Sequence, residues 1–383
     1  MKERFYSLDV FRGATVAFMI TVNNPGSWDH IYPPLDHAKW NGCTPTDLVF
    51  PFFLFAVGNA MAFVIPRLQQ AGTSVFMKKV IKRTLLIFLI GLFLNWCPFF
   101  KWDHDQLVFK VWENIRLLGV LQRIALCYFL ASLIVYFMKP ENAVITCIIL
   151  LAGYWALCYF AGAPGDPYSI NGWFGTQLDK GILGETHMYH GEGIAFDPEG
   201  FASIFAAVVQ VVFGYFAGRY IQQKGKTYEM LSHLLIAGCI MVFIGICWNE
   251  FFPLNKKIWT SSYTVYTTGL ALMVLSVAIF FIEFKHQKGA LSRFFDAFGK
   301  NPLFIFVLSG FLPRLLGLIR ISDGAMPDGS ARYTSPFGWF YEHICQPVFS
   351  NENNSSLLYA LIMITFYWLI AYWLDKKKIY VKV

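Results

Sequence analysis

Long apolar runs recur along the whole of this chain, and they constrain its fold more than any other feature. Each run has about 18–24 residues, enough for an α-helix to cross a hydrocarbon core of roughly 30 Å. Lipid offers the backbone no hydrogen-bond partners, so each separate span must be a helix. Ten spans are expected, at about 8–25, 46–65, 82–100, 117–138, 143–162, 201–221, 233–253, 262–284, 302–320 and 356–374.

The composition also indicates a membrane protein. Hydrophobic residues make up 56% of the 383 residues and charged residues 14%, and the mean hydropathy is +0.48. Soluble domains average about 25% charged residues. We therefore predict an all-α, polytopic integral membrane protein whose residues 1–383 form a single transmembrane domain without a separate soluble domain or linker.

Lysine and arginine predict the orientation of the spans. If the N-terminus is inside, the inner connections carry roughly twice as many of these residues as the outer ones. Both termini are then cytoplasmic, and we expect a bacterial inner membrane and contact with anionic lipid. This bias accounts for the net charge of +7, so no nucleic-acid partner is expected. The first run contains Arg12 and lacks a small-residue cleavage site, which predicts a retained helix rather than a signal peptide.

The cysteines predict no metal site. Six of the eight lie in or at the ends of predicted spans, where cysteine serves as a small apolar residue. No CxxC or zinc-type spacing occurs, and no metal is expected. Cys43 and Cys345 both fall in predicted outer segments, so a disulfide between them is an option in an oxidising compartment.

A polar segment at residues 35–51 lies between the first two spans. Thr44 suits the N-cap of the second span, Pro45 suits its first helical position, and Asp47 follows three residues after the cap. Asp47 can therefore serve as a capping carboxylate that matches the helix dipole. The same fixed carboxylate can also orient a nearby imidazole, and the two roles are compatible.

His37 in this segment is the best acid/base candidate, because histidine titrates close to neutral pH. The alternative is an interfacial histidine with a structural hydrogen bond, and His30 lies nearby as a second histidine. Asn23 ends the first span, where it either caps the helix or donates a hydrogen bond to a developing oxyanion. Asn23, His37 and Asp47 share a depth near the outer boundary, which favours a joint catalytic site.

Other polar residues are candidates for ligand binding. Arg123, beside Gln122, is expected about 10 Å inside the fourth span, where it must meet either a carboxylate partner or a ligand such as phosphate. An inner basic mouth is expected from Lys82, Arg83, Lys300 and Asn301, although the first three are also ordinary positive-inside residues.

Candidate substrate contacts lie in the predicted outer segments. These are Trp40, Asn41 and His187. A tryptophan at this depth is either an interfacial anchor or a stacking surface for a sugar ring. The stretch 185–192 contains two histidines, but its glycines argue against a helix that would place both on one face, so we predict a loop with at most a substrate contact.

Several of these motifs together resemble the heparan-α-glucosaminide N-acetyltransferase family of transmembrane acyltransferases. The resemblance covers nearly the whole chain and is most specific in its N-terminal part. Its motifs are Ser-Leu-Asp-Val-Phe-Arg-Gly at 7–13, Val-Asn at 22–23, His-Ala-Lys-Trp-Asn-Gly at 37–42, Asp-Leu-Val-Phe-Pro at 47–51, Gly-Val-Leu-Gln-Arg-Ile at 119–124 and Asp-Pro-Glu-Gly at 197–200.

This resemblance implies transfer of an acetyl group from cytoplasmic acetyl-CoA to the amine of a glucosamine-type sugar at the outer face. It implies His37 as the catalytic residue and Asn23 as its partner, and it implies a homodimer. The inner basic mouth and Arg123 would hold the coenzyme. His37 would either deprotonate the sugar amine for direct attack or itself accept the acetyl group, and the sequence leaves both open.

Two features of the chain depart from the lysosomal members of that family. We expect no long luminal domain before the first span, and the loops at 163–200 and 321–355 look individual. We therefore expect a smaller amino sugar or a cell-wall sugar as acceptor rather than heparan sulfate. The alternative functions are a sugar or muropeptide permease that binds through Arg123 and the outer aromatic residues, and a purely structural membrane subunit.

Overall fold

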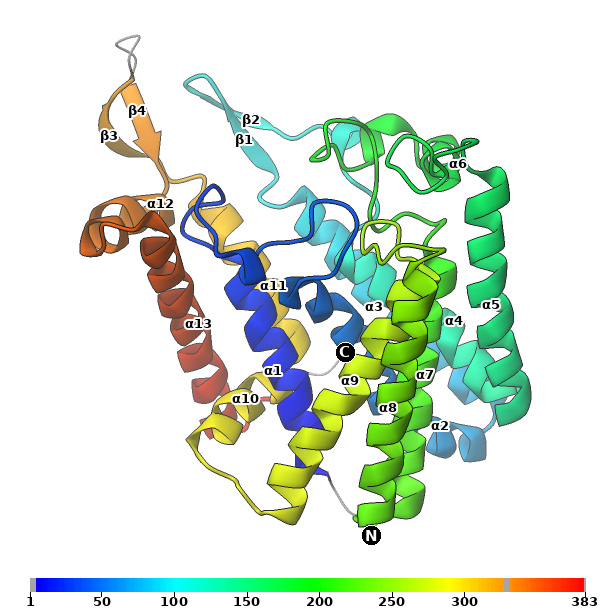
Figure 1. Ribbon diagram of the computed structural model, residues 1–383. Coiled ribbons are helices and arrows are strands. Elements are labelled where there is room, and N and C mark those ends of the chain that lie inside the picture. Colours follow the sequence, from blue (N-terminus) through cyan, green and yellow to red (C-terminus); the bar gives the residue numbers. More distant parts are fainter. Residues whose placement is uncertain (1–4, 327–330, 382–383) are drawn as a thin grey trace.

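The computed structural model describes residues 5–326 and 331–381, and each of the ten predicted spans is a helix in it (Figure 1). The all-α membrane class is thus confirmed. The long helices are α1 (Tyr6–Asn23), α2 (Val49–Ala71), α3 (Thr73–Trp96), α4 (Val120–Phe137), α5 (Pro140–Ala161), α7 (Ile204–Lys224), α8 (Tyr228–Asn249), α9 (Ser261–Ile279), α11 (Pro302–Leu316) and α13 (Glu352–Lys376).

Not every predicted span is equally apolar. In the described residues, seven helices are long and apolar enough to cross a membrane, or eight if the bent pair α10 (Ala290–Lys300) and α11 counts as one span. α1 and α3 have the length but carry charged residues, such as Asp9 and Arg12 in α1. The predicted ninth span at 302–320 is corrected, because α11 ends at Leu316 and α10 precedes it at an angle of 80°.

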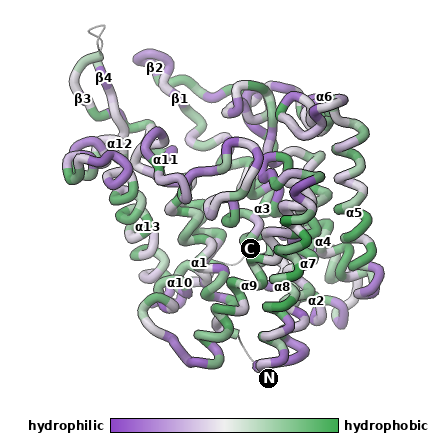
Figure 2. Tube along the Cα trace, in the orientation of Figure 1, coloured by the Kyte–Doolittle hydropathy of each residue, from purple (hydrophilic) through white to green (hydrophobic). Residues whose placement is uncertain are grey.

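The helices alternate in direction, so that α1 begins and α13 ends on the same side of the bundle (Figure 1). We call this the terminal side, and its assignment to the cytoplasm stays a prediction. The longer connections gather on the opposite side, the loop side, with the short helices α6 (Phe174–Leu183) and α12 (Pro336–Phe340). Figure 2 shows hydrophobic residues along the helices and hydrophilic residues in these loops.

Two antiparallel hairpins on the loop side were not expected from an all-helical prediction. One pairs β1 (Phe100–Asp103) with β2 (Gln106–Phe109), and the other pairs β3 (Ile321–Ala325) with β4 (Ala331–Thr334). Both follow a membrane helix directly, where an extended chain leaves the bundle. Strand pairing satisfies the backbone groups that the ended helix no longer serves.

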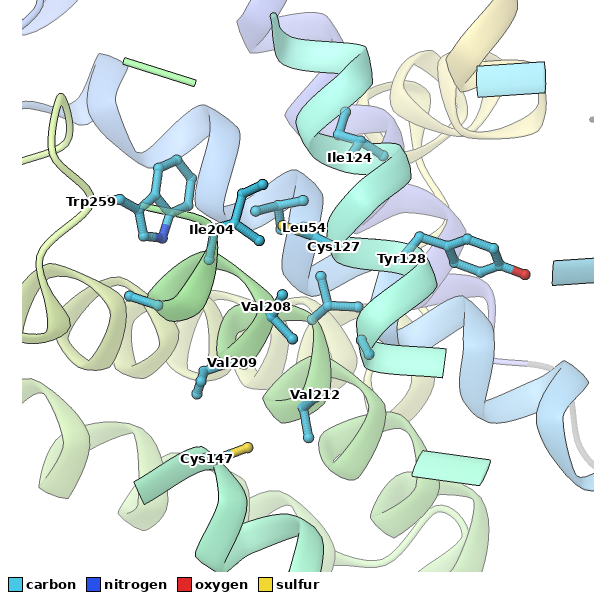
Figure 3. Close-up of a cluster of buried hydrophobic side chains, with 14 of the residues drawn as sticks. Leu54, Ile124, Cys127, Tyr128, Cys147, Ile204, Val208, Val209, Val212 and Trp259 are labelled. Atoms are coloured by element: carbon cyan, nitrogen blue, oxygen red, sulfur yellow. The ribbon is translucent and has the colours of Figure 1, made fainter. Parts of the chain in front are cut away.

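The core forms where α2, α4 and α7 meet. Figure 3 shows Leu54 from α2, Ile124 from α4 and Val208 from α7 in one buried cluster. Glycines let α2 and α7 come into backbone contact: a Cβ added at Gly58 would lie 2.0 Å from the Val211 carbonyl oxygen. Close approach through small residues is a common way to pack membrane helices.

Gly58→Ala is therefore expected to destabilise the protein by about 1–3 kcal/mol, because the added methyl group pushes α2 away from α7. The measurement is the midpoint of thermal unfolding of the purified protein in detergent. Gly153→Ala in α5 is the matched control, since no atom lies within 4 Å of its added Cβ. An equal midpoint for the two variants would contradict the close-packing argument.

All eight cysteines are free thiols in this structure. Cys43 and Cys345, for which a disulfide was considered, are therefore not joined. Cys345 is buried in an apolar cluster with residues of α1, α10 and α13, whereas Cys43 belongs to the connection between α1 and α2. The two cysteines thus lie in different regions of the protein.

Candidate active site

The connection between α1 and α2 folds around one buried carboxylate. Asp47 lies in a 3-10 turn, Pro45–Leu48, which leads directly into α2. Its Oδ2 atom accepts hydrogen bonds from the backbone N–H groups of Thr44 and Ala38, both at 3.0 Å, and from the Thr44 hydroxyl at 3.1 Å. The predicted capping role of Asp47 is confirmed by this geometry.

The other oxygen of the same carboxylate holds the candidate catalytic imidazole. His37 Nδ1 lies 2.7 Å from Asp47 Oδ1. An ionised carboxylate only accepts hydrogen bonds, so Nδ1 carries the proton and Nε2 keeps its lone pair. Asp47 is 1% exposed and the His37 side chain 40% exposed, so a buried anchor presents an accessible base.

A cavity of about 180 Å³ lies next to this pair, between α1, α2, α4 and α11. Asn23 from the end of α1 and His37 both line it, and Asp47 holds His37, so the structure brings together the three residues that were predicted to share one depth. The Asn23 amide has no hydrogen-bond partner among residues 5–326 and 331–381, which leaves it available to a ligand. Most of the remaining wall is apolar. We call this space the loop-side cavity.

Lys256, in the α8–α9 connection, was missed as a site residue. It lines the loop-side cavity, and its Nζ lies 3.1 Å from His37 Nδ1, 3.3 Å from His37 Nε2 and 3.6 Å from Asp47 Oδ1. Burial lowers the pKa of Lys256 below its ordinary value, while Asp47 and Glu199 act in the opposite direction. A signal was available, because adjacent lysines in a predicted outer loop run against the positive-inside bias.

Glu199 is the second missed residue of the cavity wall. Its carboxylate pairs with Arg116, which also binds Asp197 through two nitrogens at 2.6 and 3.0 Å. Burial opposes the charge on Glu199, but Arg116 and Arg123 lower its pKa below the ordinary value. Glu199 therefore presents a negative charge to the cavity. Its signal was the Asp-Pro-Glu-Gly motif at 197–200, which had been noted without a role.

The predicted substrate contacts Trp40 and Asn41 hold the loops together instead of lining the loop-side cavity. Trp40 Nε1 donates to the Tyr168 carbonyl oxygen at 2.9 Å, and Asn41 Oδ1 accepts from Asn255 Nδ2 at 3.2 Å. His187 lies further away, with Nδ1 at 2.7 Å from the Ile115 carbonyl oxygen. The structure thus gives all three partners within the protein.

Arg123 and Gln122 are fully buried near the loop-side end of α4. Arg123 donates to the Gly200 carbonyl oxygen at 2.9 Å and to the Ser203 hydroxyl, and its guanidinium lies 5.3 Å from the centre of the Trp259 ring. Because α4 begins at Val120 rather than near residue 116, Arg123 lies only one turn inside the helix. Arg123 and Gln122 thus lie at the loop-side end of α4, and their expected role in binding the coenzyme stays a prediction.

The four expected members of the inner basic mouth lie on α3 and at the junction of α10 and α11. The Arg83 guanidinium of α3 lies 4.9 Å from the centre of the Tyr128 ring, and Lys82 beside it is exposed. Lys300, at the end of α10, pairs with Asp296 and Asp375. Asn301 binds the C-terminal segment, through the Ile379 carbonyl oxygen and the Val381 N–H.

Within the described residues, one group of three side chains has the type and spacing of metal ligands. It consists of Asp323, Glu342 and His343 on the loop side, with ligand atoms within 4.8 Å of one another. Arg332 pairs with both acids, at 3.7 and 2.9 Å. Both acids are therefore already paired with a protein cation, and we assign the group no metal.

The fold and this site define a polytopic membrane protein with a carboxylate-anchored histidine facing a cavity between its helices. Residues 4–246 match the catalytic family of heparan-alpha-glucosaminide N-acetyltransferase, and the chain belongs to this family. The predicted family is thus confirmed.

Two curated relatives carry that enzyme name. The heparan-alpha-glucosaminide N-acetyltransferases of Homo sapiens and Mus musculus are 26% and 25% identical to this chain over 441 and 439 aligned residues. The alignments cover 100% of this chain and 60% and 61% of the relatives. The chain therefore spans about three fifths of the length of these relatives.

Proposed function

We propose that this chain is a membrane N-acetyltransferase that transfers the acetyl group of acetyl-CoA to the amine of a glucosamine-type sugar on the loop side. The names of the relatives support the acetyl group and the amino-sugar acceptor. The observation that carries the proposal is that Asn23 and an Asp47-anchored His37 line one cavity. The apolar wall of that cavity suits the short thioester end of the donor.

The chemistry of the transfer rests on His37 Nε2. In direct transfer, Nε2 takes a proton from the sugar amine while the amine nitrogen attacks the thioester carbon and the coenzyme thiolate leaves. In the two-step alternative, Nε2 first attacks the thioester carbon and the coenzyme thiolate leaves. The sugar amine then attacks the acetyl carbon, the bond from that carbon to Nε2 breaks, and Nε2 takes the amine proton. Asn23 would donate a hydrogen bond to the oxyanion in either route, and Asp47 would keep the proton on Nδ1.

A second cavity supports entry of the donor from the terminal side. It has a volume of about 260 Å³ and lies between α1 and α2, lined in part by Asp9, Arg12 and Asn59. Along α2, Phe53 lines the loop-side cavity and Ala56 lines this one. The two residues are three positions apart, about 4.5 Å along the helix at 1.5 Å per residue. The arm of the donor that carries the acetyl group would pass along α2 from this cavity to the loop-side cavity.

The phosphate groups of the donor would then lie at the terminal side. Lys300 and Asn301 are close to the second cavity, because Arg12 Nε donates to the Gly299 carbonyl oxygen at 3.0 Å. Lys82 and Arg83 on α3 do not line this cavity. We therefore favour Lys300 and Asn301 as the first phosphate contacts, with Lys82 and Arg83 as outlying positive charges.

The test is acetylation of free glucosamine by the purified protein, with acetyl-CoA as donor and mass spectrometry of the product. N-acetylglucosamine formed at a rate proportional to protein concentration supports the proposal. Uptake of the sugar into proteoliposomes without any acyl donor, and without acetylated product, would instead favour the permease. Cytoplasmic termini, a bacterial inner membrane and a homodimer stay part of the proposal.

Asn23→Ala is expected to reduce kcat by about 10²–10³-fold, because one oxyanion donor is lost. The KM for acetyl-CoA should change little. Asn24→Ala is the matched control, since Asn24 Nδ2 donates to the Ile20 carbonyl oxygen at 2.8 Å and does not line the loop-side cavity. Steady-state kinetics of both variants decide the point, and an equal loss in the two would remove Asn23 from the chemistry.

A further inference from the structure

The amine of Lys256 lies beside the imidazole that an acceptor amine must approach. Its Nζ is almost equidistant from the two ring nitrogens, at 3.1 and 3.3 Å, and both side chains line the loop-side cavity. Reacting atoms in a productive complex lie about 3–3.5 Å apart. A lysine amine and the sugar amine are the same nucleophile chemically, so Lys256 is an internal analogue of the acceptor.

The position of Lys256 is fixed by contacts between two loops. Gly42 N–H, a few residues after His37, donates to the Leu254 carbonyl oxygen at 2.7 Å. Asn41 and Asn255 share a side-chain hydrogen bond at 3.2 Å. The α1–α2 and α8–α9 connections are thereby held together at the two residues directly before the lysine, so its amine approaches the imidazole in a set geometry.

The neighbouring lysine has a different environment. Lys257 pairs with Glu192 at 2.7 Å, lies 5.9 Å from the centre of the Trp40 ring and does not line the loop-side cavity. Burial lowers the pKa of Lys256, against the opposing effect of Asp47 and Glu199, so the ammonium group loses a proton more easily to give the nucleophilic amine. Two adjacent lysines thus differ in access to the imidazole, and this makes Lys257 a natural internal control.

We propose that Lys256 is a self-acetylation site: when an acetyl thioester is present and no sugar amine is bound, the Lys256 amine accepts the acetyl group at His37. The inference rests on the proposed function. A bond forms between Lys256 Nζ and the acetyl carbon, and the bond from that carbon to His37 Nε2, or to the coenzyme sulfur in direct transfer, breaks. The proton lost by the amine goes to His37.

The modification would switch the enzyme off. Acetylation removes the positive charge that lies 3.6 Å from Asp47 Oδ1, and it leaves a neutral amide with an extra acetyl group in the loop-side cavity. The sugar amine could then no longer approach His37. Because the sugar and Lys256 compete for one position, bound sugar should protect the lysine.

The experiment incubates the purified full chain with isotope-labelled acetyl-CoA, with or without glucosamine, and locates the label by peptide mass spectrometry. Label is expected at Lys256 and not at Lys257, and it should rise in step with the loss of transferase activity. Glucosamine should slow both changes. In His37→Ala the label at Lys256 should fall by about 100-fold or more, whereas Lys257→Arg should keep it.

Each other outcome counts against the inference. Acetylated glucosamine without label at Lys256 overturns self-acetylation and leaves the proposed function standing. Equal label at Lys256 and Lys257, or undiminished label in His37→Ala, shows uncatalysed acetylation and also overturns it. If neither glucosamine nor any lysine is acetylated, the proposed function fails and the inference fails with it.

Discussion

Replacing His37 with alanine is expected to reduce acetyl transfer to glucosamine by at least about 10²–10⁴-fold, the usual contribution of a positioned general base. The imidazole is the one side chain of the loop-side cavity, among the described residues, that is held in a defined tautomer by a buried carboxylate. Its removal takes away the proton acceptor in direct transfer and the acetyl carrier in the two-step route. The loss should appear in kcat, in membranes and in the purified protein.

The fold should survive this substitution. Asp47 keeps its three donors at Oδ2 and the Lys256 ammonium near Oδ1, so no buried charge is left without a partner. Thermal unfolding should therefore stay close to that of the unmodified protein. His30→Ala is the matched control, because His30 belongs to the same connection but pairs with Glu352 and does not line the loop-side cavity. Retained transfer in His37→Ala would remove the imidazole from the mechanism.

The sequence predicted the helices well because apolar run length is a local property of the chain. It missed what depends on packing. The start of the ninth span at 302 was predicted, but the helix α10 before it and the angle of 80° between the two helices were not. At their junction Asn301 exchanges hydrogen bonds with residues near 380. A contact over that sequence distance leaves no local pattern. The hairpin at 100–109 was missed because its aromatic residues extend the apolar run of α3.

The candidate site likewise contains residues that local sequence patterns predicted and residues that they did not. His37 and Asp47 are ten positions apart in one connection, so the cap signal at Thr44 already placed the carboxylate near the imidazole. Lys256 comes from a loop 219 positions away, and no spacing rule links it to His37. Arg123 shows the remaining limit. An arginine inside an apolar span indicates that the guanidinium group has a partner. Only the fold shows that Arg123 contacts Gly200, Ser203 and Trp259.

Asp47→Asn is expected to lower kcat by about 10²–10⁴-fold while the protein stays folded. Oδ2 of Asp47 accepts three hydrogen bonds, from Ala38 and Thr44, whereas Oδ1 accepts one, from His37. In the variant, the single amide oxygen must take the position with three donors. The amide NH₂ group then faces His37 Nδ1.

The consequence for the imidazole follows from hydrogen-bond polarity. An NH₂ group donates to Nδ1, so the ring proton moves to Nε2, and the lone pair that accepts the substrate proton or the acetyl group is lost. Asparagine is itself a good capping residue, so the cost in stability should stay below about 1 kcal/mol. Kinetics and thermal unfolding together separate the two effects.

Asp36→Asn supplies the matched control for the lost charge. Asp36 accepts a hydrogen bond from the His37 backbone N–H at 2.7 Å and makes no contact with the ring. An amide oxygen can take over that hydrogen bond, so the tautomer is unaffected and activity should stay close to normal. If Asp47→Asn and Asp36→Asn proved equally active, Asp47 would be a helix cap alone, and the control of proton position at His37 would have to come from Lys256.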